Sequence, residues 1–131
     1  MSATTIEEAI RDILVTDNGV KAITTRVYPG YVPQDPTYPL IVYMKVTGER
    51  DHHVQGPSGF AHPRFQVEAW AETYAAAKAL ANAIRAKLDG YTGTAGTVKI
   101  RSTLIESERD MYESALPCHR ISMDFILWHD E

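Results

Sequence analysis

The chain has 131 residues, of which 44% are hydrophobic and 23% charged, and its formal net charge at pH 7 is −4. This length suits one domain over residues 1–131, and the composition is near the average of soluble globular proteins, which disfavours a largely disordered chain. The acidic balance disfavours a nucleic-acid module, because such modules usually carry a basic excess or a basic stripe.

The cysteine content and the hydropathy pattern point to a chain made and used in a cytoplasm. The one cysteine, Cys118, cannot form an internal disulfide, so no cysteine framework of a secreted domain is expected. No apolar run approaches the ~20 residues that a membrane helix needs. The segment Met1–Glu8 lacks the basic start and the apolar core of a signal peptide.

A first helix is predicted over roughly residues 5–16. Thr4 or Thr5, followed by Glu7 or Glu8, fits a capping box. The apolar residues of this segment recur at steps of three and four, as one face of a helix requires. They are Ile6, Ala9, Ile10, Ile13 and Leu14.

A loop and a buried strand follow this helix, which Asn18 and Gly19 are expected to end. Residues 27–39 contain four prolines, which remove backbone donors and predict an ordered loop with at most a short strand at Val27–Tyr28. Residues 40–47 are dense in β-branched and aromatic side chains, which is typical of a buried strand.

Residues 48–63 form a long, polar, glycine-rich segment that links two strands, and it is predicted to be a loop. Long loops inside compact domains are usually functional or mobile. The next segment, 64–70, alternates cleanly between apolar and polar residues, which predicts a half-buried strand.

The second half of the chain predicts one helix and two strands. Thr73 can cap a helix that the Asp89–Gly90 pair ends, and small and aliphatic residues recur between them at helical spacing. Residues 91–97 are predicted to be a loop. Residues 98–104 and 119–128 alternate like strands.

The segment between those two strands, 106–117, is polar and is predicted to be a surface connection. Four of its residues are carboxylates that accompany Arg109. They are Glu106, Glu108, Asp110 and Glu113. Paired carboxylates can perform acid–base chemistry in a cleft, but four on a polar connection are more often a solvated surface.

The order of elements is therefore helix, short strand, strand, strand, helix, strand, strand. Strands joined by loops favour antiparallel pairing, so we expect an α+β domain with an antiparallel sheet of four to five strands. The two helices cover one face of this sheet. The other face is expected to stay solvated or to meet another subunit.

No catalytic, cofactor or metal site emerges from the residues. Asp51, His52, His53 and His62 could ligate zinc, but their spacing matches no strong zinc motif, so solvated histidines are the preferred interpretation. Gly56–Gly59 lacks the Gly-Lys-Ser/Thr ending and the following helix of a phosphate-binding loop, and fits a tight turn instead.

Cys118 and His119 make a poor nucleophile–base pair, because neighbouring residues of a strand point to opposite faces. Cys118 is interpreted as a small, partly buried residue near a strand start. Trp70 and Trp128 could be contact hot spots or core aromatics, and the core interpretation is preferred for Trp70. The absence of a catalytic constellation, together with a long loop and a bare sheet face, favours protein–protein contact.

A series of short segments over most of the chain after residue 25 forms a pattern known from one protein family. The segments are Tyr38–Tyr43, Gly56–Gly59, Arg64–Glu68, Tyr74–Ala81, Ile84–Arg85 and Leu88–Gly90, with a weaker match in Tyr112–Glu113, Arg120 and Asp124–Phe125. In their order and spacing they resemble the tail-completion, or tail-terminator, proteins of siphophages and gene transfer agents.

This resemblance implies a structural protein of the virion, made in the host cytoplasm, that is not an enzyme and needs no cofactor. It implies a ring, typically of six subunits, at the head-proximal end of the tail tube. The ring ends tube growth and docks to the head connector, and DNA passes through it without specific binding. Its partners would be further copies of itself, the tail tube protein and the connector, and no membrane is involved.

The contacts within such a ring are assigned to the long loop and the residue after it. The expected interface residues are Arg50, Asp51, His52, His53, Gln55, Gly56, Pro57, Ser58, Gly59, Phe60 and Arg64. Two alternatives stay open: another neck component such as a head-completion stopper, or a small cytoplasmic ligand-binding or enzymatic α+β domain. The last predicts a deep pocket with perturbed titratable groups.

Overall fold

The computed structural model describes residues 4–47, 50–53, 56–115 and 117–130, and of residues 50–53 and 56–60 it describes the backbone alone. These residues form three helices: α1 (Ile6–Thr16), α2 (Asn18–Lys21) and α3 (Tyr74–Leu88). They also form eight strands: β1 (Val27–Pro29), β2 (Leu40–Thr47), β3 (Arg50–His53), β4 (Gly56–Ala61), β5 (Arg64–Ala71), β6 (Gly93–Ala95), β7 (Val98–Glu113) and β8 (Cys118–Asp130).

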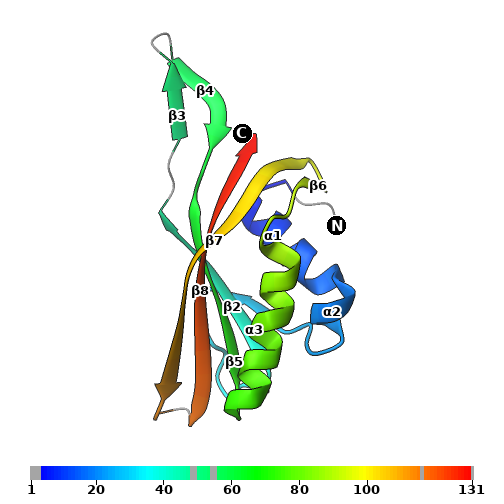
Figure 1. The fold of residues 1–131 in the computed structure, drawn as a ribbon, viewed down its shortest axis with the longest axis vertical. Helices are drawn as coiled ribbons and strands as arrows, with labels where there is room; N and C mark the ends of the chain where they lie inside the picture. Colours follow the sequence, from blue (N-terminus) through cyan, green and yellow to red (C-terminus); the bar gives the residue numbers. More distant parts are fainter. Residues whose placement is uncertain (1–3, 48–49, 54–55, 116, 131) are drawn as a thin grey trace.

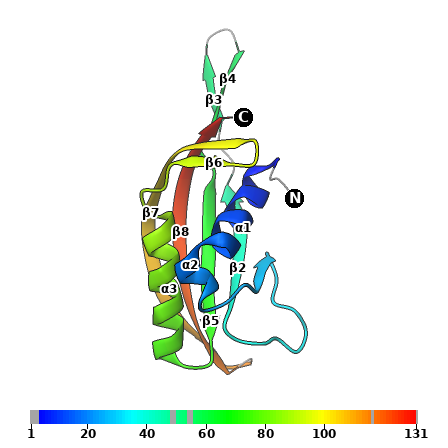
Figure 2. The same cartoon turned by 90° about the vertical axis from the view of Figure 1, so that its right-hand side faces the viewer.

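The strands join in one sheet, and the helices lie on one of its faces (Figures 1 and 2). Its order is β1-β2-β5-β8-β4-β3, and β7 pairs with β8 on one side and with β6 on the other. The α+β class is confirmed. The prediction of four to five antiparallel strands is wrong, because eight strands form and β1 pairs parallel to β2.

Both predicted caps and both predicted helices are present. The Thr5 hydroxyl accepts from the Glu8 backbone N–H while the Glu8 carboxylate accepts from the Thr5 N–H, which completes the capping box. Asp17 ends α1, and its carboxylate accepts from the Val20 N–H at 3.1 Å, so the chain turns directly into α2. A short helix therefore occupies the position where Asn18 and Gly19 predicted only a stop.

The main core lies between the helices and the sheet. Each helix buries one apolar stripe, as the spacing predicts, and the strands supply alternate residues such as Phe65, Val67 and Phe125. The small alanines of α3, among them Ala77 and Ala81, are fully buried and let the helix lie close to the sheet.

A second, smaller core lies on the opposite face of the sheet. It comprises Leu40, Val42, Trp70 and Cys118. Partly buried residues of the proline-rich loop, Val32 and Tyr38, pack against it. The face expected to be bare is therefore covered in part by the chain's own loop, and Trp70, 5% exposed, is a core residue as predicted.

Three segments predicted as loops contain strands. Residues 93–95 form β6, residues 50–53 and 56–61 form the two strands of the β3–β4 hairpin, and β7 continues through Glu113. Residues 106–110 are exposed on both faces, so they lack the apolar alternation by which sequence reveals a strand. Their pairing with β8 makes them a strand regardless of side-chain pattern.

Candidate interaction surfaces

The β3–β4 hairpin projects beyond the rest of the sheet (Figure 1). Its link to the body is short, because β4 pairs with β8 only at Phe60 with Asp130 and at Ala61 with His129. Among the described strands, β3 pairs only with β4. In the described backbone, the hairpin is therefore joined to the rest of the sheet by few strand pairs.

The predicted interface residues lie mostly in this hairpin. Arg50–His53 are in β3 and Gly56–Phe60 are in β4, whereas Gln55 lies outside the described residues. Arg64 begins β5, and its guanidinium forms ion pairs with Glu106 and with Asp124, the latter at 3.4 Å. Arg64 thus joins the start of β5, which follows the hairpin in the chain, to β7 and β8.

The rings of His62 and Trp128 stack at the same base, with centroids 6.1 Å apart and an interplanar angle of 21°. His62 follows β4 and Trp128 lies near the end of β8, so the stack joins the root of the hairpin to the last strand. Trp128 is therefore an anchoring aromatic of this junction.

A buried ion pair crosses the outer face of the sheet, the face without helices. The Glu68 side chain is 4% exposed, and an Arg120 nitrogen lies 3.4 Å from it. The Trp70 indole N–H also donates to Glu68, at 3.3 Å, and the Arg120 guanidinium lies over the Trp70 ring. A second Arg120 nitrogen reaches Glu113 at 2.8 Å. Arg120 therefore ties the end of β7 to β5.

The carboxylates of β7 do not converge on a cleft. Each pairs with a different cation of the same chain: Glu106 with Arg64, Glu108 with Arg85, Asp110 with Lys78, and Glu113 with Arg120. The prediction that they form a surface and not an acid–base pair agrees with this separation.

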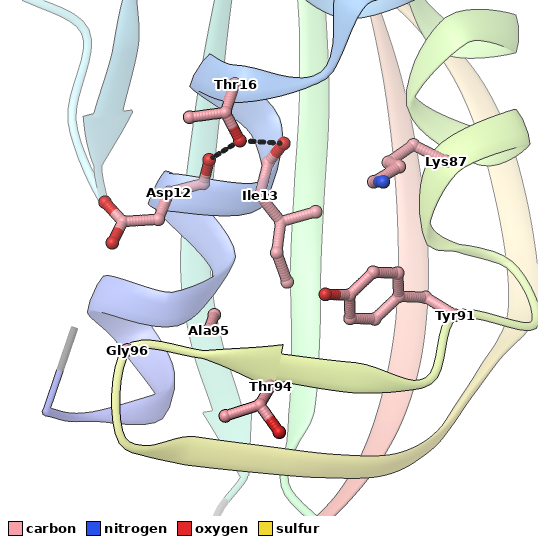
Figure 3. A pocket seen from close by; sticks show the side chains of 8 residues that line it. All are labelled: Asp12, Ile13, Thr16, Lys87, Tyr91, Thr94, Ala95 and Gly96. Carbon is pink, nitrogen blue, oxygen red and sulfur yellow. Dashed lines mark hydrogen bonds between the residues drawn. The ribbon is translucent and has the colours of Figure 1, made fainter. Parts of the chain in front are cut away.

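Two hollows test the expectation of a ligand pocket. One, of about 190 Å³, lies between α1, the end of α3 and β6, beside Lys87 and Tyr91 (Figure 3). The other, of about 290 Å³, lies beside Tyr74, Tyr112 and His119. The first volume lies below, and the second at, the lower limit of about 300 Å³ for small-molecule sites, so neither hollow has the size of a typical deep ligand pocket.

The second hollow adjoins one shifted carboxyl group. The Tyr74 hydroxyl hydrogen-bonds Asp110 at 2.6 Å and the Lys78 ammonium lies 3.1 Å from the same carboxylate. These two contacts, the tyrosine bond first, lower the pKa of Asp110. The carboxylate therefore stays ionised and keeps both of these partners, which suits an ion pair and not a general base.

Cys118 and His119 point apart, as predicted. Cys118 is fully buried in the outer core, whereas the His119 ring contacts Tyr74 and Tyr112 on the helix side. Burial raises the pKa of the Cys118 thiol, which therefore stays protonated at neutral pH. The pair cannot act as a nucleophile and its base.

The histidine cluster weighed as a metal site stays untested. Asp51, His52 and His53 lie where only the backbone is described. In the part of the chain with described side chains, no three His, Cys, Asp or Glu residues gather as metal ligands do. No described helix is both long and apolar enough to cross a membrane.

A strand edge open along much of β7 was missed in the sequence. Residues Ser107–Glu113 pair with β8 on one side, and no described strand pairs with them on the other. An unpaired strand edge is a feature by which chains join one another. The fold and its surfaces are therefore those of a protein suited to assembly with other chains.

Comparison with known proteins identifies the family. Residues 8–130 match the family described as tail completion protein gp17, and the chain belongs to that family. It is accordingly a structural component of the tail of a phage-like virion, and not an enzyme.

A solved structure agrees with this fold. A chain in the virion of a native gene transfer agent particle superposes with a TM-score of 0.80, over 96% of this chain and 95% of that chain. The two sequences are 16% identical, so this likeness concerns the fold alone. No curated protein matches the chain.

Proposed function

We propose that this protein forms a ring of six copies at the head-proximal end of the tail tube. The ring ends tube growth and docks to the head connector, and DNA passes through its centre without specific binding. Membership of the tail completion family supports a place in the tail. The observation that carries the assembly role is the projecting β3–β4 hairpin.

The hairpin, with the loop residues that surround it from 48 to 63, makes the contacts of the ring. An isolated two-stranded hairpin is marginally stable in water, and this one is joined to its own sheet by two residue pairs. Contact with another chain supplies strand pairing beyond these two pairs. The interface residues are thus Arg50–His53, Gln55, Gly56–Phe60 and Arg64.

The subunits stay monomeric until they meet the tail. A hairpin contact is small, and one such contact alone gives weak association. On a symmetric tube end many contacts form at once, and the effective concentration of neighbouring copies strengthens each of them. Assembly is thereby confined to the place where the ring is needed.

Electron microscopy of lysates that lack this reading frame tests the function. We expect separate DNA-filled heads and unattached tails, with many tails too long. Joined particles of normal length would overturn the proposal. Heads that leak DNA, together with tails of normal length, would instead indicate that the protein is a head-completion stopper.

Deletion of residues 52–60 tests the role of the hairpin. The variant should remain folded by circular dichroism and monomeric by size-exclusion chromatography, because the helices and the part of the main core that the structure describes lie outside this segment. It should fail to cap tails when added to a lysate lacking the wild-type chain. A second variant, in which a glycine–serine segment of the same length replaces 52–60, controls for chain length and should fail equally. A deletion variant that caps normally would refute the role.

A further inference from the structure

The outward edge of β7 is covered by the chain itself over its first half only. Strand β6 pairs with Val98–Ile100. Beyond it, the Gly90 N–H donates to the Thr103 carbonyl at 2.7 Å, and the Ile105 N–H donates to the Asp89 carboxylate at 3.1 Å. The end of α3 thus protects the edge as far as Ile105.

The second half of β7, Ser107–Glu113, is left open, and we name it the open edge. Its seven residues pair in unbroken register with Asp124 through Cys118 of β8. In an antiparallel ladder alternate residues direct their N–H and C=O groups away from the partner, so roughly three or four residues present both groups outward. No other described residue pairs with this side.

The charges on the open edge do not block it. Natural proteins protect edges with charged side chains, especially lysine, and the open edge contains no lysine. Here Glu108 and Asp110 pair with α3 on one face, and Arg109 and Glu113 pair with Asp124 and Arg120 on the other. With their charges partnered above and below the sheet, these side chains leave the backbone accessible.

A hollow beside the open edge can receive a side chain. It is bounded by Tyr74 of α3 and by Tyr112 and His119 of the last two strands. Tyr112 is 58% exposed and its ring meets that of His119 at 5.1 Å. Strand-addition sites combine an edge that binds backbone with pockets that bind alternate side chains.

Two occupants from a second copy fit the open edge poorly. The antiparallel register that would use all seven residues of two open edges sets Asp110 opposite Asp110, and like charges in that position are destabilising. Strand β1, at the other side of the sheet, ends in Pro29, which has no N–H to donate. Strand β3 carries neither defect, and its outer side pairs with no described strand.

We propose that the open edge accepts strand β3 from the hairpin of a second copy of this chain. The proposal rests on the proposed function, in which the hairpin makes the ring contacts, and it adds the surface that those contacts meet. The hairpin gains a third strand and the open edge gains its missing partner. Donor and acceptor differ, so the interface is head-to-tail and each copy uses both once, as a closed ring requires.

The pairing also fixes how the copies are oriented. The hairpin and the open edge lie at opposite ends of the long axis of the molecule (Figure 1). A neighbour must therefore bring its hairpin end to the far end of the next copy. The long axes then incline strongly to the axis of the ring and do not stand parallel to it.

Cysteine cross-linking in assembled tails tests the pairing. One variant carries His52→Cys with Tyr112→Cys, and a second carries His53→Cys with Tyr112→Cys, because adjacent strand residues face opposite sides. After a short bismaleimide is added, we expect one of them to give a ladder of covalent oligomers up to the ring size. The native Cys118 is fully buried and should stay silent in the wild-type chain.

The controls separate the alternatives. Y112C alone should give no dimer, and a dimer would show pairing between two open edges and overturn the proposal. A ladder from H52C or H53C combined with P29C would show that the hairpin pairs with β1 of the neighbouring copy, and would also overturn the proposal. Capped tails without any ladder, in a system where deletion of 52–60 abolishes capping, would refute the open edge as acceptor and leave the proposed function intact.

Discussion

Arg120 offers the sharpest test of what holds the open half of β7 in place. Its guanidinium pairs with the buried Glu68 and with Glu113, and it donates to the Met111 sulfur at 3.1 Å. Replacing Arg120 by methionine keeps most of the side-chain volume and removes the charge. The Glu68 carboxylate then remains buried without its cation.

The size of the effect follows from the burial. Removing one partner of a fully buried ion pair costs about 3–5 kcal/mol. The Arg120 side chain is 22% exposed, and the Trp70 N–H still donates to Glu68, so we expect a loss of about 2–3 kcal/mol in the free energy of unfolding. For a chain of this length that lowers Tm by about 6–15 °C.

Urea denaturation at pH 7 measures this loss, and a double-mutant cycle assigns it. Because glutamine needs no cation, E68Q/R120M should be more stable than the sum of the two single losses predicts, by about 1–2 kcal/mol. K78M is the matched control. It removes the exposed ion pair to Asp110, which solvent screens, and should therefore lower the free energy of unfolding far less than R120M does. An R120M variant as stable as K78M, or strict additivity in the cycle, would refute the reasoning.

Three further predictions concern the two cores. Phe125→Ala removes a fully buried ring from the centre of the main core and should cost about 3–5 kcal/mol in urea titrations, whereas a loss under about 1 kcal/mol would contradict the packing. Burial raises the pKa of Tyr38 to about 12, so stability should fall as the pH rises from the ordinary tyrosine pKa of about 10 to that value, and Tyr38→Phe should flatten the decline. Cys118 should react with a thiol reagent only in the unfolded chain, so the labelled fraction should rise with denaturant concentration along the unfolding transition. Rapid labelling of the native chain would contradict the burial of Cys118 in the outer core.

The fold could be predicted from sequence wherever a side-chain pattern reports burial. The stripe of α1, the alanine-rich face of α3 and the alternation of β5 and β8 each reflect one face packed against the core. The caps at Thr5 and Thr73 depend on local hydrogen bonds alone, and both form. Local chemistry and burial pattern agree in these elements, so short windows of sequence suffice.

The parallel pairing of β1 with β2 shows what a local pattern omits. Val27–Pro29 reads as a short strand inside a proline-rich loop, and its direction relative to Ile41–Tyr43 depends on the path of the chain between them. The same loop returns over the outer face, where Tyr38 and Val32 pack on the second core. Neither arrangement leaves a periodic signature in the residues themselves.

The candidate surfaces were only half visible in the sequence, and the reason is physical. Residues 48–63 are predicted to be functional because a long polar segment is uncommon, although their pattern does not predict strands. Residues 106–113 are not predicted to be a contact surface, because their charged side chains resemble those of a solvated connection. The information that would place this part of β7 lies in another element. Lys78 and Arg85 lie seven residues apart on α3, and they form ion pairs with Asp110 and Glu108 of β7.

Two of the strands that sequence misses, β3 and the second half of β7, also have an open edge, and one property explains both features. A strand that is polar on both faces buries too little apolar surface to alternate, so its order depends on backbone pairing and ion pairs. Strand β3 has such pairing on one side, and so does the open edge Ser107–Glu113. Each lacks what the other presents. A strand whose own side chains do not commit it to a core can join a neighbouring sheet without exposing apolar surface beforehand, and this is what the proposed assembly from monomers requires.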